Sequence, residues 1–208
     1  STVALKMAQI KGFTLPSPVD DPYYGVVFDL PAAFLEVIFK IDDSKNYFYF
    51  KHFLNFLLFF TASIFFYKLL LNRFTNYSVA LVGTLFFVLS PRIYGNSFFN
   101  MKDIISLSLL TIALYYCFKL FDKTNYKNFL IFSIFAALST SQRMYGIFLP
   151  LSFIIFYLLS VLSKKKDLDY LPGIIFFCIS FFIFFIIFWP ALWNNPVENF
   201  VLAYKYFG

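Results

Sequence analysis

Residues 171–188, LPGIIFFCISFFIFFIIF, contain no charged side chain and lie within an uncharged run that extends over residues 170–197. A helix that crosses the hydrocarbon core of a membrane needs about 20 mostly apolar residues. A transmembrane barrel would instead show alternating segments of about 10 residues, whereas this stretch is apolar on all sides. The stretch therefore predicts a membrane-spanning helix, and it sets the fold class for the rest of the chain.

Uncharged runs of the same kind recur along the chain. They cover residues 52–67, 74–91, 104–118, 128–142 and 144–163. The composition agrees with them, because 61% of the 208 residues are hydrophobic and only 13% are charged, whereas a soluble domain has about 25% charged residues. We predict an all-α integral membrane protein, built as a multi-span helical bundle, and we exclude an ordinary soluble protein.

The whole chain, residues 1–208, is expected to form a single transmembrane domain. An external loop and an amphipathic helix occupy residues 1–46, about six spans occupy residues 47–188, and residues 189–208 form an external tail that leads to a further segment. The expected spans cover residues 47–71, 77–90, 103–121, 128–140, 146–163 and 171–188. In residues 24–41 the apolar side chains recur every three to four positions, which is typical of a helix lying in the membrane interface.

The cationic side chains are distributed unevenly between the expected turns. Eight lie in the turns after the first, third and fifth spans, and four lie on the other side after Lys51. The richer side is expected to face the cytoplasm. The opposite, external or lumenal face then carries the amphipathic helix, PRIYGNSFFNMKD (91–103), STSQRMYG (139–146) and WPALWNNPVENF (189–200). The net charge of +6 follows from these turns, so no nucleic-acid partner is expected.

The segment 91–103 is the longest polar interruption between two apolar runs, and we expect a functional loop there. Asp103 begins an expected helix, so its carboxylate can cap that helix. The same helix start, with Lys102 beside it, also suits a phosphate group. Arg143 stands between two uncharged runs, where burying an arginine costs about 3 kcal/mol. Its side chain either extends to the interface or has a phosphate or carboxylate partner, which Arg92 can share.

Other polar and aromatic residues have plain structural explanations beside functional ones. The lone His52 is more often a packed or hydrogen-bonded side chain than a catalytic group or metal ligand. Asp20 and Asp21 fit an ordinary turn as well as a general base. Trp189 and Trp193 are interpreted as interfacial residues that can also line a lipid groove. The two cysteines lie inside apolar runs without Cys or His neighbours, which indicates packing residues and no metal site.

Four segments occur in order with the expected spans between them. They are DPYYGVVFDLPAAFLE (21–36), SPRIYGNSFFNMKDI (90–104), STSQRMYGI (139–147) and FWPALWNNP (188–196). Together they resemble the C-type glycosyltransferase superfamily, GT-C, and within it the protein O-mannosyltransferase and aminoarabinose transferase-like bacterial members. Family members often have His where this sequence has Asn96. The family's first span and first acidic motif normally precede a segment like YYGVVFDL, so we expect an N-terminally truncated fragment.

The resemblance implies an integral membrane enzyme that takes a sugar from a polyprenyl-phosphate donor and passes it to a lipid, glycan or protein acceptor. It also implies inversion at the anomeric carbon, and we expect the bacterial inner membrane with the active face external or periplasmic. An acidic residue of the first external loop generally serves as base in such enzymes. A second one, in the loop that matches Asp103, helps at the donor or metal site. No cofactor is required by the sequence, and a divalent cation at the donor site is left open.

The physical requirements of the reaction assign further roles. A departing phosphate needs cations, an acceptor hydroxyl needs a carboxylate, and an isoprenoid tail needs an apolar groove. The candidate catalytic residues are Asp103, Asp21 and Asp20; the candidates for binding the donor phosphate are Lys102, Arg92 and Arg143; those for lining the substrate are Tyr24, Asn96, Asn100 and Trp193. The alternative function is a transporter or flippase subunit for a phosphorylated or anionic lipid-like substrate, although the sequence shows no internal repeat.

Overall fold

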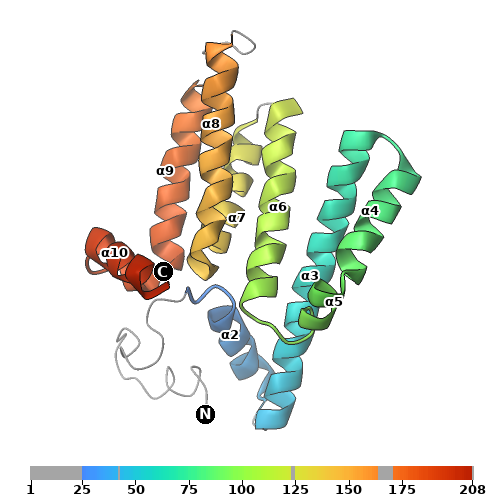
Figure 1. Cartoon of the computed structure of the whole chain (residues 1–208). Helices are drawn as coiled ribbons and strands as arrows, with labels where there is room; N and C mark the ends of the chain where they lie inside the picture. The colour runs from blue at the N-terminus through green and yellow to red at the C-terminus, as the bar shows by residue number, and fades with distance from the viewer. Residues whose placement is uncertain (1–24, 42, 123–124, 164–170, 208) are drawn as a thin grey trace.

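The computed structural model describes residues 25–41, 43–122, 125–163 and 171–207. Every regular element in these ranges is a helix (Figure 1). The elements are α2 (Asp29–Phe39), α3 (Ser44–Phe74), α4 (Tyr77–Leu89), α5 (Pro91–Asn96), α6 (Asp103–Asp122), α7 (Tyr126–Gln142), the 3-10 turn η1 (Met144–Ile147), α8 (Phe148–Leu162), α9 (Leu171–Phe188), the 3-10 turn η3 (Pro190–Leu192) and α10 (Pro196–Phe207).

The predicted all-α membrane class is confirmed. Within the described ranges, four helical segments are long and apolar enough to cross a membrane: Lys45–Phe74, Asp103–Phe121, Met144–Leu162 and Leu171–Phe188. The two other predicted spans are also helical, but α4 has 13 residues and α7 has 17. At about 1.5 Å per residue both are shorter than the hydrocarbon core of about 30 Å. The number of spans therefore stays a prediction.

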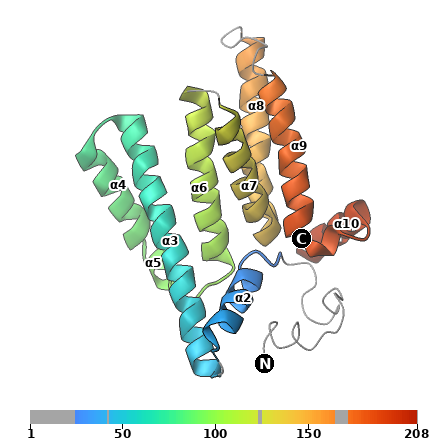
Figure 2. The ribbon, with the colours of Figure 1, turned by 180° about the vertical axis from the view of Figure 1, so that it is seen from behind.

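Helix α7 lies between α6 and α9 and forms the centre of the bundle (Figure 2). Small side chains such as Ser133, Ala136 and Ala137 on α7 are fully buried, which lets neighbouring backbones approach closely. Phe132 of α7 stacks on Phe177 of α9 with ring centroids 4.6 Å apart. Because other helices surround it, α7 can carry polar residues that a helix exposed to lipid could not. This explains why its sequence is less apolar than that of its neighbours.

Helices α3 and α4 form a hairpin on the other side of α6 (Figures 1 and 2). A Cβ atom on Gly83 of α4 would lie 2.6 Å from the Leu70 side chain, so glycine lets α4 pack closely on α3. Phe87 of α4 packs against Phe59 and Phe66 of α3, with ring centroids 5.7 and 4.5 Å apart. The hairpin is thus held by aromatic contacts, while the bundle of α6 to α9 has its own core.

The three short helices α2, α5 and α10 lie at one end of the bundle, where α6 begins and α7 and α9 end (Figure 1). We call this the Asp103 end, and the opposite end, where α6 finishes, the Lys119 end. Helix α2 exposes a set of large apolar side chains, as the interfacial helix predicted for residues 24–41 requires: Leu30, Phe34, Val37, Ile38 and Phe39. Helix α10 crosses the end of α9, and Phe200 of α10 packs against Trp189.

The segment 91–103 differs from the expected loop, because its first part forms the helix α5. Pro91 occupies the first turn of α5, where its fixed φ and its missing N–H group suit a helix start. Only residues 97–102 connect α5 to α6. The expectation of a loop was therefore wrong for residues 91–96. The polar residues Asn100 and Lys102 still lie outside the helices.

Candidate functional site

Arg143 forms an ion pair with Asp103 at the Asp103 end of the bundle. The Nη2 atom of Arg143 lies 2.7 Å from Oδ1 of Asp103, and the two side chains are 26% and 54% exposed. Asp103 opens α6, and Arg143 stands in extended backbone between α7 and η1. Two positions 40 residues apart in the sequence are thus joined. Of the alternatives for Arg143, the structure provides the carboxylate partner.

Asn100 performs the capping role that was expected of Asp103. Its side-chain oxygen accepts the backbone N–H groups of Lys102 at 3.2 Å and of Asp103 at 2.9 Å. Its amide nitrogen donates to Oδ2 of Asp103 at 3.1 Å. The Asp103 carboxylate accepts no backbone N–H group among the described residues, so the interpretation of Asp103 as a helix cap was wrong. Asn100 thus accepts the first N–H group of α6, while the Asp103 carboxylate pairs with Arg143.

A cavity of about 380 Å³ opens beside this ion pair. Its walls are Asp103, Ser141, Gln142, Arg143, Met144, Tyr145 and Trp189. Trp189 is 1% exposed and its ring lies edge-on to Phe185, so it is a buried wall of the cavity and not an interfacial residue. Gln142 is 4% exposed, and its side-chain oxygen has no hydrogen-bond partner among the described residues. A buried amide with an unused acceptor suits a ligand that carries hydroxyl groups.

Helix α3 holds the connection between α5 and α6 in place. Nδ1 of His52 lies 2.7 Å from the carbonyl oxygen of Phe98, so the ring donates its N–H there. Asn55, which is fully buried, donates to the carbonyl oxygen of Ser97 at 2.9 Å. The rings of Phe56 and Phe98 stack with centroids 5.4 Å apart. The structural interpretation of His52 is therefore confirmed, and its bond supports the segment that carries Asn100 and Asp103.

Gly25 fixes the start of the described chain against the same end. Its N–H group donates to the carbonyl oxygen of Ser141 at 3.0 Å. A Cβ atom at this position would lie 2.3 Å from that oxygen, so only glycine allows the approach. Ser141 also lines the cavity beside Arg143. The candidates Asp20, Asp21 and Tyr24 lie outside the described residues.

The family of the protein follows from a comparison with known families. A family model described as dolichyl-phosphate-mannose-protein mannosyltransferase matches residues 30–193. The chain belongs to this family. It is therefore an integral membrane glycosyltransferase of the GT-C type, as the four sequence segments predicted. The match includes two of those segments in full and parts of the first and the last. No curated protein and no solved structure matches the chain.

The remaining candidates of this glycosyltransferase are dispersed around the pair. Lys102 is exposed and directly precedes Asp103. Arg92 is exposed at the start of α5, and no carboxylate of the described residues pairs with it. The amide nitrogen of Asn96 donates to the Arg92 carbonyl oxygen at 2.7 Å. Trp193 donates from its indole to the carbonyl oxygen of Ile186 at 2.8 Å and is not a wall of the cavity.

A second ion pair attaches α2 to α3 in this mannosyltransferase-family protein. Nζ of Lys51 lies 2.5 Å from Oδ1 of Asp29, and the lysine side chain is 13% exposed. The ammonium group also lies over the rings of Phe28 and Tyr47, at 5.8 and 5.5 Å from their centroids. Sequence reasoning missed this pair, because the contact between α2 and α3 depends on tertiary packing that leaves no local pattern in the sequence. Among the described residues, no group of three or more His, Cys, Asp or Glu side chains could hold a metal ion.

Proposed function

We propose that this protein transfers a sugar from a polyprenyl-phosphate donor to an acceptor hydroxyl, and that the sugar phosphate binds in the cavity beside Asp103 and Arg143. The observation that carries the proposal is the ion pair in the wall of a cavity of about 380 Å³ in a member of this family. A guanidinium group presents N–H donors in a planar fork that matches a phosphate. In the absence of the donor, the ion pair with Asp103 holds the guanidinium group of Arg143 at the cavity.

The cations are proposed to act on the leaving group. As the bond to the sugar breaks, negative charge grows on the polyprenyl phosphate, and fixed positive charge stabilises it most in the transition state. Arg143 lines the cavity, Lys102 adjoins Asp103, and Arg92 stands at the start of α5. We assign these three residues to the donor phosphate. The exposed apolar surfaces of the spans are proposed to accommodate the isoprenoid tail.

A carboxylate is proposed to act as the general base that removes the proton of the acceptor hydroxyl. A carboxylate takes the proton of the acceptor hydroxyl, the hydroxyl oxygen bonds to the anomeric carbon, and the bond from that carbon to the phosphate oxygen breaks with its electron pair leaving on the phosphate. Attack from the side opposite the phosphate inverts the anomeric carbon. Asp103 is engaged by Arg143, which favours the donor side for it. Asp20 and Asp21 are the proposed bases in the first external segment.

The surroundings of the reaction remain proposals drawn from the sequence. Tyr24, Asn96, Asn100 and Trp193 are proposed to contact the substrates. Of these, Asn96, Asn100 and Trp193 do so outside the cavity, which they do not line. The distribution of cations favours an external or periplasmic active face, and the resemblance favours the bacterial inner membrane. The acceptor is a lipid, a glycan or a protein with a hydroxyl group.

Transfer can be tested directly in membranes that contain the protein. The membranes are incubated with radiolabelled polyprenyl-phosphate sugars, mannose first, and the label is followed into lipid, glycan and protein fractions. We expect label in one fraction and release of unlabelled polyprenyl phosphate in equal amount. No transfer from any donor, together with sugar-dependent flux across vesicles, would establish the transporter alternative instead.

A further inference from the structure

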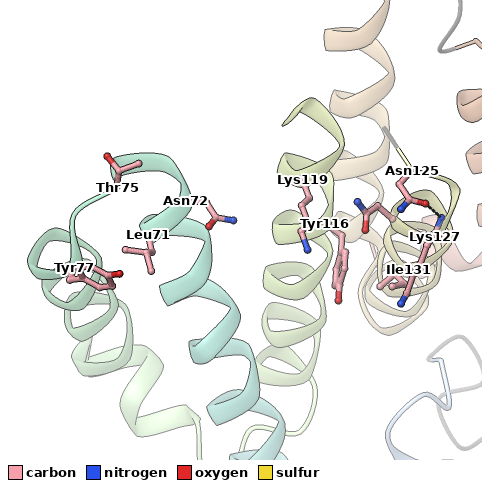
Figure 3. A pocket seen from close by; sticks show the side chains of 10 residues that line it. Leu71, Asn72, Thr75, Tyr77, Tyr116, Lys119, Asn125, Lys127 and Ile131 are labelled. Carbon is pink, nitrogen blue, oxygen red and sulfur yellow. Dashed lines mark hydrogen bonds between the residues drawn. The ribbon is translucent and has the colours of Figure 1, made fainter. Parts of the chain in front are cut away.

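A second, larger cavity lies at the Lys119 end of the bundle. It has a volume of about 960 Å³, and its walls come from the turn between α3 and α4 and from the adjoining parts of α6 and α7 (Figure 3). Helix α6 has 20 residues and joins the two ends. At about 1.5 Å per residue it is about 30 Å long, which is the thickness of the hydrocarbon core. The two cavities therefore lie at opposite surfaces of the membrane.

The walls of this cavity are cationic and rich in hydrogen-bond donors. They include the two lysines Lys119 and Lys127 and the three side-chain amides of Asn72, Asn125 and Asn128. None of the described residues in the walls is acidic. Figure 3 shows Asn72 projecting from α3 toward α6, so the polar groups belong to both sides of the opening. Such a set of groups is complementary to an anion.

Lys119 is held in the wall by aromatic side chains. Its ammonium group lies 5.3 Å from the ring centroid of Tyr115 and 5.9 Å from that of Tyr116. The side chain is half-buried, unlike the freely extended lysines of an ordinary turn. Lys127 lies in the first turn of α7, where Asn125 caps the helix by accepting the Lys127 N–H group at 2.9 Å. The positive end of the α7 dipole adds to the charge of both lysines.

We propose that this cavity binds the phosphate head group of an anionic membrane lipid. The lysines and amides supply charge and donors for the phosphate oxygens, and basic pockets between membrane helices are suited to such head groups. Leu71 and Ile131 in the walls offer apolar surface for the part of the lipid next to the head group. A lipid is favoured over a free phosphate because the cavity opens where the helices meet the membrane surface. The site is separate from the proposed transfer reaction.

The bound lipid connects two parts of the molecule. Asn72 and Leu71 belong to the α3–α4 hairpin, whereas Lys119 and Lys127 belong to α6 and α7. A lipid that contacts both sides of the cavity therefore stabilises the hairpin against the bundle.

The test measures lipid binding by the whole protein. It is purified into phosphatidylcholine nanodiscs that contain a small fraction of phosphatidylglycerol, and native mass spectrometry counts the lipids that stay bound. Each of the two lysines that line the cavity is expected to contribute about 1 kcal/mol toward a bound anionic lipid, so removing both weakens binding about 30-fold. The double variant Lys119→Gln with Lys127→Gln should lose the retained phosphatidylglycerol. The double arginine variant, which keeps both charges, should retain it.

Lys68→Gln is the matched control. Lys68 stands at the same end of the bundle and lies 5.4 Å from the ring centroid of Phe65, but it does not line the cavity. This variant should retain phosphatidylglycerol as the wild type does. Equal retention by the double glutamine variant would overturn the proposal, and so would equal loss in Lys68→Gln. Displacement of the lipid by millimolar inorganic phosphate would show a site for free anions and would also overturn it. None of these readouts depends on sugar transfer.

Discussion

The two ends of the helix bundle hold their cations in different ways. At the Asp103 end, Arg143 is engaged by a carboxylate that Asn100 orients, and both Asp103 and Arg143 line a small cavity with buried walls. At the Lys119 end, two lysines line a larger opening with no acid among its described walls. The carboxylate of Asp103 orients the guanidinium group of Arg143. The ammonium group of Lys119, which lies beside aromatic rings, contributes mainly its positive charge. This difference indicates that the Asp103 end suits a reaction that needs oriented groups, whereas the Lys119 end suits binding of an anionic head group.

The largest effect is expected from Asp103→Asn, which removes the charge that directs Arg143 but keeps the shape of the side chain. Removing one preorganised hydrogen-bond donor from a transition state costs about 100-fold to 1,000-fold in rate, and Asp103 positions such a donor on Arg143. We therefore expect transfer to fall by at least about 100-fold while the protein still inserts in the membrane. Initial rates with a saturating labelled donor measure this.

Glu198→Gln is the control for that variant, because Glu198 is an exposed carboxylate on α10. It should transfer at the wild-type rate. Wild-type turnover in Asp103→Asn would show that the carboxylate only orders the start of α6, and the contrast between the two ends would then lose its chemical meaning.

A smaller effect is expected from Gly25→Ala. The added Cβ would lie 2.3 Å from the Ser141 carbonyl oxygen, and this backbone cannot move aside cheaply because Ser141 belongs to the buried last turn of α7. Overpacking of this kind costs about 1–3 kcal/mol. We expect transfer to fall about tenfold. Gly95→Ala in α5 is the control, because a Cβ there would meet nothing within 4 Å. Equal activity of the two variants would place the Gly25 contact outside the site.

The smallest effect is expected from Asn55→Leu on α3. The change removes the hydrogen bond to the Ser97 carbonyl oxygen, worth about 0.5–1.5 kcal/mol, and loosens the segment before Asp103. Transfer should fall about twofold to tenfold, and hydrogen exchange of residues 97–103 should become faster. Thr61→Val removes a bond to the Leu57 carbonyl within α3 itself and should change neither quantity. Unchanged exchange in Asn55→Leu would show that α3 does not position this segment.

Much of the fold could be predicted because membrane spans depend on composition. The run 171–188 has no charge at all, and its helix has the predicted bounds. Helix α7 was harder to recognise as a span from the sequence. A central helix contacts protein instead of lipid, so it can carry polar residues, and these shorten its apolar run. Pro91 was interpreted as part of a loop, although proline also starts helices.

The site could be predicted only in part, because pairing between distant residues leaves no local pattern. Asp103 and Arg143 were both recognised from their setting, and a carboxylate partner for Arg143 was one of the stated alternatives. Their contact depends on the packing of α6 against α7, which no spacing in the sequence encodes. Gln142 was overlooked, although a glutamine that closes an apolar run next to an arginine is a usable signal. The Asp29–Lys51 pair was missed because its contact likewise depends on packing, here of α2 against α3.

The central claim is that Arg143 holds the donor phosphate at the Asp103 end, and donor binding to Arg143→Gln tests it most directly. Equilibrium binding of a labelled polyprenyl-phosphate sugar is measured with the protein in nanodiscs, and Lys68→Gln serves as the control at the opposite end. A hydrogen bond to a charged group contributes about 1.5–3 kcal/mol, so the affinity of Arg143→Gln should be about 10-fold to 150-fold weaker. Lys68→Gln should bind as the wild type does. Wild-type affinity in Arg143→Gln would contradict the account.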